Sequence, residues 1–205
     1  KYILYCGGHY SLLPFEVDLV KELIEEMNIK YFELNYIIRV HPLDDFSRWT
    51  TPGKFPPNVI LDLPWAQNPT NPLISSTEEY GFLRHGRILK NASIILNIAS
   101  TSSLDACVLD KPVYNLYFSK YNDNKILDSY YYSEHFRPII ESDAAPLLRD
   151  KKEVESKIVQ ALRNGDSLSD KRRNFAKSYC GFDRDSSFAR RFGSYLEMQL
   201  KHDCN

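Results

Sequence analysis

The chain has 205 residues, of which 43% are hydrophobic and 13% aromatic, and this much apolar material excludes a disordered protein. Its formal net charge of -1 excludes a sequence-independent nucleic-acid binder, because such a protein needs a surplus of basic side chains. No apolar run approaches the roughly 18 residues of a membrane-spanning helix, and the first residues lack the pattern of a signal peptide.

The cysteines show no paired CxxC spacing, which is typical of reduced thiols in a cytoplasmic protein; they are Cys6, Cys107, Cys180 and Cys204. The chain begins directly in a predicted strand, without an initiator methionine. We therefore expect residues 1–205 to form a single domain that has been excised from a longer cytoplasmic protein.

Apolar runs and helical repeats alternate along the chain. Short runs typical of strands occupy Tyr2–Cys6, Tyr36–Val40, Asn58–Leu63, Ser93–Ile98, Val113–Phe118 and Phe136–Ile140. Apolar residues at helical spacing predict helices over Phe15–Met27, Thr77–Leu89, Leu104–Val108, Lys152–Arg163, Ser169–Tyr179 and Ser186–Leu200. Leu43–Pro57 is expected to form a loop with a short helix, and Ser119–Tyr132 gives no clear prediction. The alternation predicts an α/β fold, a doubly wound, Rossmann-like, mostly parallel sheet with a helical C-terminal tail.

Hydroxyl side chains fill the turn that follows the predicted strand Ser93–Ile98, namely Ser100, Thr101, Ser102 and Ser103. In a parallel α/β sheet, ligands bind beyond the carboxyl ends of the strands. Free N–H groups at the start of a helix also favour a phosphate there. These hydroxyls are therefore candidate phosphate ligands, and the alternative is that they only cap the helix.

A second polar motif ends the predicted strand Tyr36–Val40, where Arg39, His41 and Pro42 stand at the carboxyl edge. The planar guanidinium of Arg39 suits a phosphate, and its side chain should share a face with that of His41, two residues further on. The alternative for Arg39 is an ion pair that covers the sheet edge. The alternative for His41 is a loop histidine whose hydrogen bonds are satisfied by the backbone.

The His41-Pro42 and Ser100-Thr101 pairs together resemble two motifs of GT-B glycosyltransferases and their relatives. These relatives are CDP-glycerol glycerophosphotransferases, bacterial sialyltransferases and capsule Kdo transferases. The resemblance extends over roughly residues 2–196. It implies the C-terminal, donor-binding domain of a GT-B enzyme, whose acceptor-binding N-terminal domain would precede this chain.

One pattern in those families is more detailed. In teichoic-acid polymerases, Ser-Ser is followed by Asp and then by Lys-Pro, which is similar to Ser100-Thr101, Asp105 and Lys111-Pro112. By this resemblance, Asp105 would accept a hydrogen bond from a ribose hydroxyl, although Glu is the commoner residue in many GT-B families. The alternative is that Asp105 is only a favourable charge near a helix N-terminus.

The resemblance also implies roles for the remaining site residues. His41 would be the catalytic residue, donating a hydrogen bond or a proton to the leaving phosphate. Gly7 and Gly8 would let the first loop approach the donor. Leu63 to Trp65 would help hold the base through backbone groups, and the alternative for Trp65 is simple packing. Arg39, Ser100, Thr101, Ser102 and Asp105 complete the expected substrate-binding set. No cofactor or catalytic metal is expected, because GT-B enzymes typically work without one.

The leading hypothesis is binding of a nucleotide-activated donor, with glycosyl or glycerophosphoryl transfer in surface polysaccharide biosynthesis. The donor would be cytidine-activated, such as CDP-glycerol, and the acceptor a glycan or a lipid-linked chain. One alternative is a UDP-sugar transferase or a UDP-GlcNAc 2-epimerase-like enzyme, although the epimerase pattern has Ser-Gly-Gly where this chain has Ser-Thr-Ser. Another is a non-catalytic nucleotide-sugar binding module. Basic residues at 171–173 and 190–191 would suit anionic lipid at the inner face of the membrane, with a solvated surface as the alternative.

Overall fold

The computed structural model describes residues 1–51, 55–63, 79–121 and 125–181. Within this part of the chain, parallel strands form one sheet in the order β3-β2-β1-β4-β5-β6. The strands are β1 (Ile3–Cys6), β2 (Tyr36–Arg39), β3 (Val59–Asp62), β4 (Ile94–Asn97), β5 (Val113–Leu116) and β6 (Leu147–Leu148). The order runs outward from β1 in one direction and from β4 in the other. The strand order therefore reverses between β1 and β4, which is the switch point of the sheet.

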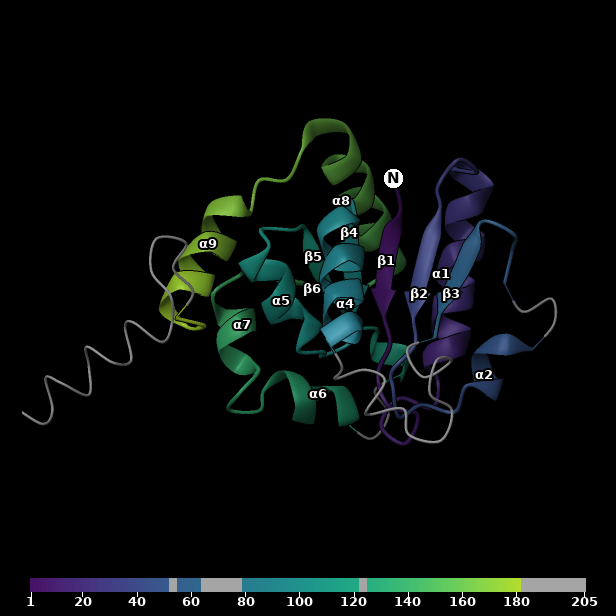
Figure 1. Ribbon diagram of the computed structural model, residues 1–205, viewed down its shortest axis with the longest axis horizontal. Helices are drawn as coiled ribbons and strands as arrows, with labels where there is room; N and C mark the ends of the chain where they lie inside the picture. The colour runs from purple at the N-terminus through teal and green to yellow at the C-terminus, as the bar shows by residue number, and fades with distance from the viewer. Residues whose placement is uncertain (52–54, 64–78, 122–124, 182–205) are drawn as a thin grey trace, which may run out of the picture.

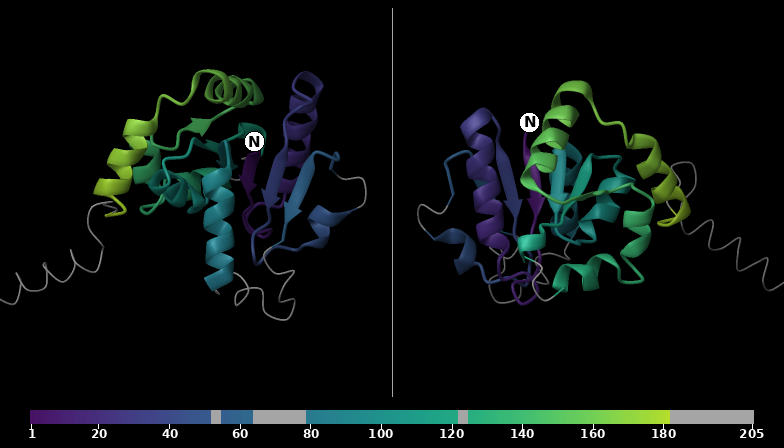
Figure 2. Two further views of the ribbon diagram at one scale, coloured as in Figure 1. Left: turned by 45° about the horizontal axis from the view of Figure 1, so that its top comes forward. Right: turned by 180° about the vertical axis from the view of Figure 1, so that it is seen from behind.

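Helices cover both faces of this sheet. Helices α1 (Glu16–Lys30) and α8 (Lys151–Asn164) lie on one face, whereas α4 (Glu79–Asn91) and α5 (Ser102–Val108) lie on the other (Figure 1, Figure 2). Ion pairs tie α1 to α8, with 2.7 Å between Lys30 Nζ and Glu155 Oε2 and 3.2 Å between Lys151 Nζ and Glu22 Oε2. The predicted doubly wound α/β fold is confirmed.

The remaining short elements lie around the sheet. They are α2 (Ser47–Thr50), the 3-10 helix η2 (Ser119–Tyr121), α6 (Ile126–Tyr131), α7 (Arg137–Glu141) and α9 (Ser169–Ser178). Helix α9 packs against α5, so the expected helical C-terminal part is present. The helix predicted over Ser186–Leu200 lies outside the described residues. In the part of the chain that is described, no helix is both long and apolar enough to cross a membrane.

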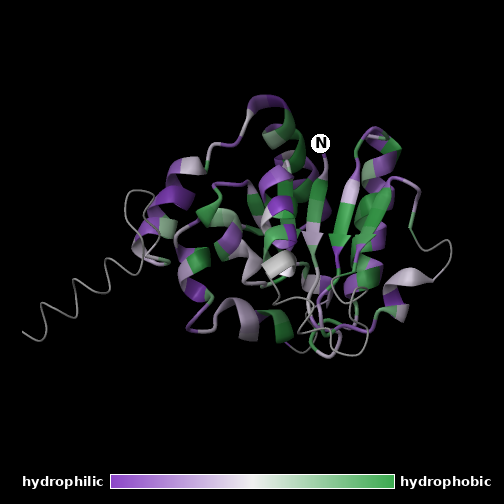
Figure 3. Ribbon diagram, in the orientation of Figure 1, coloured by the Kyte–Doolittle hydropathy of each residue, from purple (hydrophilic) through white to green (hydrophobic). Residues whose placement is uncertain are grey.

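The core is built on the central strands. Every residue of β1 and β4 is buried, and Figure 3 shows hydrophobic colour concentrated on the sheet, with hydrophilic colour on the outer faces of the helices. The apolar runs read from the sequence thus correspond to strands covered on both faces. Full burial of each such Ile or Leu side chain contributes about 1.5–3 kcal/mol to folding.

One predicted strand is wrong. Phe136–Ile140 was expected to be extended, but the structure places helix α7 at Arg137–Glu141, and the sixth strand is Leu147–Leu148. Pro138 stands in the first turn of α7, where its fixed φ angle and missing N–H group are tolerated. The buried side chains Phe136 and Ile139 are three residues apart, which is helical spacing. The two-residue β6 is too short for a hydrophobic pattern to reveal it.

A buried polar network holds the turn after β4. Asn97 is fully buried and accepts a hydrogen bond from the Ser100 N–H at 2.9 Å, while its amide donates to Ser103 Oγ at 3.0 Å. Asn115 on β5 donates to the Ala145 carbonyl at 2.9 Å, and Ser103 Oγ donates to Asn115 Oδ1 at 3.3 Å. The polar side chains among these apolar strands therefore fix where the turn leaves the sheet.

We expect Asn97→Ala to lower the free energy of unfolding by about 1–3 kcal/mol, because the partly buried Ser100 N–H loses its acceptor and the buried Ser103 hydroxyl loses one of its two side-chain partners. Urea denaturation followed by circular dichroism measures this change. Asn91→Ala is the control, because Asn91 is exposed and its loss should change the free energy by less than about 0.5 kcal/mol. Equal stabilities of the two variants would contradict the role given to Asn97.

Candidate functional site

The carboxyl ends of β1, β2 and β4 meet at one edge of the sheet, beside the point where the strand order reverses. Gly7 follows β1, His41 follows β2, and Ser100 follows β4. These three residues and Thr101 line two adjoining hollows of about 210 and 250 Å³. Small-molecule sites usually measure about 300–1,000 Å³. A nucleotide-sized ligand would therefore need both hollows, with the shared residues at its centre.

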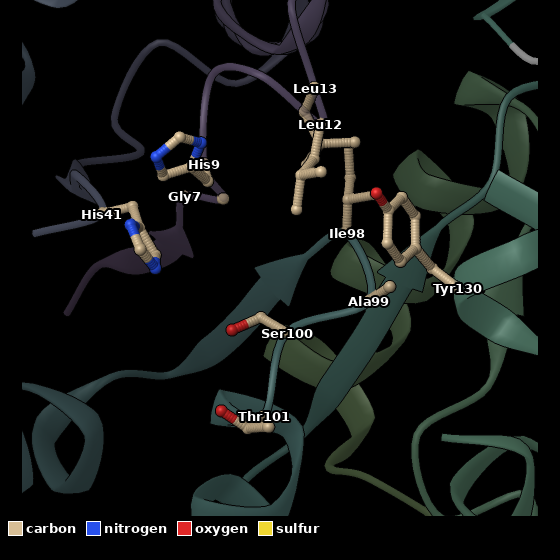
Figure 4. Close-up of a pocket in the computed structure, with 11 residues that line it drawn as sticks. Gly7, His9, Leu12, Leu13, His41, Ile98, Ala99, Ser100, Thr101 and Tyr130 are labelled. Atoms are coloured by element: carbon tan, nitrogen blue, oxygen red, sulfur yellow. The ribbon is translucent and has the colours of Figure 1, made fainter. Parts of the chain in front are cut away.

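The predicted residue His41 lines both hollows, and Figure 4 shows it in the first of them. The Leu43 N–H donates to His41 Nδ1 at 3.1 Å, so the proton of the neutral ring is on Nε2. Burial and the neighbouring His9 lower the pKa of His41, although Asp44 opposes this. The ring is therefore neutral at pH 7 and presents an Nε2–H donor. The backbone thus satisfies Nδ1 of His41, as the alternative of a loop histidine expected, and Nε2 is left for a ligand.

His9 was not among the predicted site residues. It lines the first hollow with His41, and the centroids of the two rings lie 5.8 Å apart in an edge-to-face arrangement. The only local signal was its position directly after Gly7-Gly8 at the end of a strand. No hydrophobic period or spacing links residue 9 to residue 41, so only the pairing of β1 with β2 reveals that they are neighbours.

The glycines Gly7 and Gly8 allow close approaches within the protein. A Cβ atom on Gly7 would lie 3.3 Å from the Arg39 carbonyl oxygen, and one on Gly8 would lie 2.5 Å from Leu13 Cδ1. Both residues line the first hollow, as their predicted role requires. The structural reason for glycine at these positions is nevertheless the packing of the first loop against β2 and Leu13.

Glu16, the first residue of α1, holds this loop by a hydrogen bond to its backbone. Its Oε1 accepts hydrogen bonds from the Gly8 N–H at 2.8 Å and from the Tyr5 hydroxyl at 2.7 Å. The side chain is fully buried, and Oε2 has no hydrogen-bond partner among the described residues. Burial raises the pKa of Glu16 to about 8, although both hydrogen bonds lower it. A buried carboxyl thus determines the position of the loop that lines the site.

The hydroxyl turn has divided roles. Ser100 Oγ accepts from the Ser102 N–H at 3.2 Å, whereas the Thr101 side chain makes no capping hydrogen bond. Ser103 does not face the hollows, because it is buried in the Asn97 network. Ser100, Thr101 and Ser102 line the second hollow together. Capping therefore accounts for one hydrogen bond of the Ser100 hydroxyl, and it does not account for the Thr101 hydroxyl.

The turn before Ser100 is held in a specific backbone conformation. Ala99 has φ of 44°, a left-handed value that costs a non-glycine residue about 1–3 kcal/mol. Tyr131 stabilises it by accepting from the Ala99 N–H at 3.1 Å and donating to the Leu116 carbonyl at 2.8 Å. The position of Ser100 in the crevice therefore depends on an aromatic side chain from α6.

Arg39 lines the second hollow but forms a buried ion pair with Asp62 on β3. Arg84 on α4 pairs with the other oxygen of the same carboxylate. Arg39 therefore forms the ion pair that was the alternative to phosphate binding. Its partner, Asp62, was not among the predicted site residues. In this arrangement Arg39 and Arg84 share the single negative charge of Asp62, so the three side chains together keep a net positive charge beside the second hollow.

Asp105 and Leu63 complete the predicted set. Asp105 is exposed on α5, lines the second hollow and lies 3.2 Å from His85 Nε2 on α4. Phe82, one turn before His85, lines the same hollow and is 62% exposed. Leu63 follows β3 and packs partly buried against the core, and the adjoining Trp65 lies outside the described residues.

The described residues contain no group of three or more His, Cys, Asp or Glu side chains placed to hold a metal ion. The free thiols Cys6 and Cys107 are buried, and burial raises the pKa of each to about 12. Neither thiol is therefore a nucleophile near neutral pH. The donors that line the two hollows include hydroxyls, imidazoles and backbone N–H groups.

The fold and the crevice together define a class, a doubly wound, Rossmann-like α/β domain with a crevice at the strand switch point. More particularly, the chain is similar in structure to the wall teichoic acid polymerase TagF, with a TM-score of 0.51 and 14% sequence identity. The match covers 100% of this chain and 44% of that chain, so the chain spans less than half the length of TagF. No protein-family model and no curated protein sequence matches.

The different hydrogen bonds of Ser100 and Thr101 predict different effects on stability. Thr101→Val should change the free energy of unfolding by less than about 0.5 kcal/mol, because the exposed Thr101 hydroxyl makes no cap. Ser100→Ala should cost about 0.5–2 kcal/mol, because the Ser102 N–H loses its acceptor. Urea denaturation of both variants measures the difference. A larger loss for Thr101→Val than for Ser100→Ala would show that Thr101 is the structural hydroxyl.

The raised pKa of Glu16 predicts a pH dependence of stability. The folded protein retains a proton that the unfolded chain releases between the ordinary pKa of 4.5 and the raised value of about 8. Wild-type stability therefore falls as the pH rises through this window. Glu16→Gln lacks this proton equilibrium, so its stability relative to wild type should rise by up to about 1.4 kcal/mol per pH unit. Urea denaturation at pH 5 to 8 measures the difference, and a constant difference would contradict the prediction.

Proposed function

We propose that this chain is the donor-binding domain of a transferase that uses a nucleotide-activated donor to build a cell-surface polymer. The reaction proposed is glycosyl or glycerophosphoryl transfer. A second domain, outside this chain, would supply the acceptor site, which takes a glycan or a lipid-linked chain.

One observation carries the proposal. His41 and the Ser100-Thr101 pair are about 60 residues apart in the sequence, yet they line the same two hollows at the switch point. Between them they present an imidazole N–H and two hydroxyl groups. These are donors for phosphate oxygens, and hydrogen bonds to charged groups contribute about 1.5–3 kcal/mol each.

The role proposed for His41 follows from its protonation state. When the bond to the donor phosphate breaks, negative charge develops on the leaving oxygen. A neutral imidazole with Nε2–H fixed toward that oxygen stabilises the charge without having to reorient, because the Leu43 N–H holds Nδ1. The proposed transfer needs no catalytic metal, since fixed hydrogen-bond donors stabilise this charge.

The donor proposed is cytidine-activated. The structural likeness to TagF, a wall teichoic acid polymerase, supports a role in surface-polymer assembly, and the sequence resemblance supports the cytidine base. The second hollow would hold the nucleoside, because it combines the exposed ring of Phe82 with the carboxylate of Asp105. An aromatic face suits a base, and a carboxylate suits ribose hydroxyls.

The test is calorimetric titration of the chain with CMP, CDP, UMP, UDP, GDP and ADP, with and without EDTA. We expect a cytidine nucleotide to bind best and EDTA to leave its affinity unchanged. His41→Asn should keep an acceptor for the Leu43 N–H but remove the Nε2–H donor. We expect it to weaken nucleotide binding by about 10- to 100-fold, the equivalent of one hydrogen bond to a charged group, in a protein that remains folded.

Each contrary result has a distinct meaning. A preference for UDP would replace the cytidine donor with a uridine one, and unchanged affinity in folded His41→Asn would remove His41 from the site. Absence of binding by every nucleotide would contradict the proposed function. His135→Asn is the matched control, because His135 is exposed and does not line the crevice.

A further inference from the structure

His9 and His41 are fixed in the same way by the backbone. Ser11 N–H donates to His9 Nδ1 at 3.2 Å, and Leu43 N–H donates to His41 Nδ1 at 3.1 Å. Ser11 Oγ also lies 2.7 Å from His9 Nδ1. A backbone N–H can only donate, so each Nδ1 is an acceptor, and the proton of each neutral ring is on Nε2. The first hollow therefore has two imidazole N–H donors of fixed tautomer.

The two rings do not occupy equivalent positions. His41 belongs to the set shared by both hollows, with Gly7, Ser100 and Thr101, whereas His9 lines only the first hollow. In Figure 4 the two imidazoles lie together on one side, with Leu12 and Tyr130 on the other. A phosphate at the shared residues can satisfy His41, Ser100 and Thr101 with its terminal oxygens. His9 is then the donor next to that phosphate, away from the nucleoside.

The surroundings of His9 indicate what it contacts. The first hollow has an apolar part formed by Leu12, Leu13, Ile98 and Ala99, and His9 Nε2 has no hydrogen-bond partner within the described residues. The ring also stacks on Tyr10, with centroids 4.9 Å apart, which fixes its orientation further. The apolar side chains of the hollow offer no acceptor to the His9 Nε2–H. We therefore expect this N–H to donate to an acceptor on the bound ligand.

We propose that His9 binds a second anionic group of the donor, adjacent to the phosphate at His41. This inference rests on the proposed function and narrows its substrate class. The donor carries two neighbouring negative groups beyond the nucleoside. Two donor types share this chemistry, a nucleoside diphosphate derivative and a nucleoside monophosphate linked to a sugar acid, whose carboxylate lies beside the phosphate.

The experiment compares ligands that differ in this second group. Calorimetry of the 205-residue chain with CMP, CDP and CMP-linked N-acetylneuraminic acid gives three affinities. We expect CMP to be the weakest by about tenfold or more, since hydrogen bonds to charged groups are worth at least that factor. Tighter binding of CDP identifies the diphosphate class, and tighter binding of the CMP-linked sugar acid identifies the other.

Two matched variants assign the effect to His9. His9→Asn keeps an acceptor near the position of Nδ1 and removes the Nε2–H donor, so the preference over CMP should fall to about twofold or less while CMP affinity is retained. His9→Gln places an amide N–H near the position of Nε2 and should restore part of the preference. His135→Asn controls for loss of a histidine elsewhere. Circular dichroism verifies that each variant is folded.

The contrary outcomes separate the two proposals. Equal affinities for CMP and both two-anion ligands, or a preference that persists in His9→Asn, would overturn the assignment to His9 and leave the nucleotide site intact. Absence of binding by all three ligands would contradict the proposed function and this inference together. Loss of CMP affinity in His9→Asn, in parallel with the other ligands, would show that His9 belongs to the first phosphate instead.

Discussion

The pairing of β1 with two neighbours determines the geometry of this protein. Ile3 on β1 lies opposite both Tyr36 on β2 and Ile94 on β4, and both pairings are parallel. Because parallel strands end at the same edge, the segments after β1, β2 and β4 are brought together there. The sheet is covered by helices on both faces (Figure 2), so that edge is where side chains from all three strands can reach a ligand.

Buried polar groups then fix the loops at this edge. Glu16 holds the Gly8 N–H, and Asn97 holds the Ser100 N–H. Each removes a polar group from water, which is unfavourable unless hydrogen bonds compensate. Asn97 is compensated on both sides of its amide, whereas Glu16 leaves one carboxyl oxygen without a partner among the described residues. The Glu16 side chain is buried because it lies beneath the loop that lines the crevice, and this burial raises its pKa.

The fold was predictable because its signals are local. Strands buried on both faces require continuous apolar runs, and the runs around Ile3–Cys6, Tyr36–Arg39 and Ile94–Asn97 are visible in the sequence. The error at Phe136–Ile140 has a local cause as well, since a short apolar run with helical spacing and a proline suits both states. Strand β6 pairs through only two residues, and no periodicity exists in so short an element.

The sequence by itself determined the residues at the ends of the strands: a histidine after β2 and hydroxyls after β4, each recognisable by its place beside an apolar run. Only the tertiary structure decided which side chains meet them. His9 lies beside His41 and Asp62 pairs with Arg39 because parallel pairing fixes neighbours across the sheet. A contact of that kind joins residues tens of positions apart and depends on strand order. A single sequence read along its length carries the identity of each residue but not the order in which strands pair.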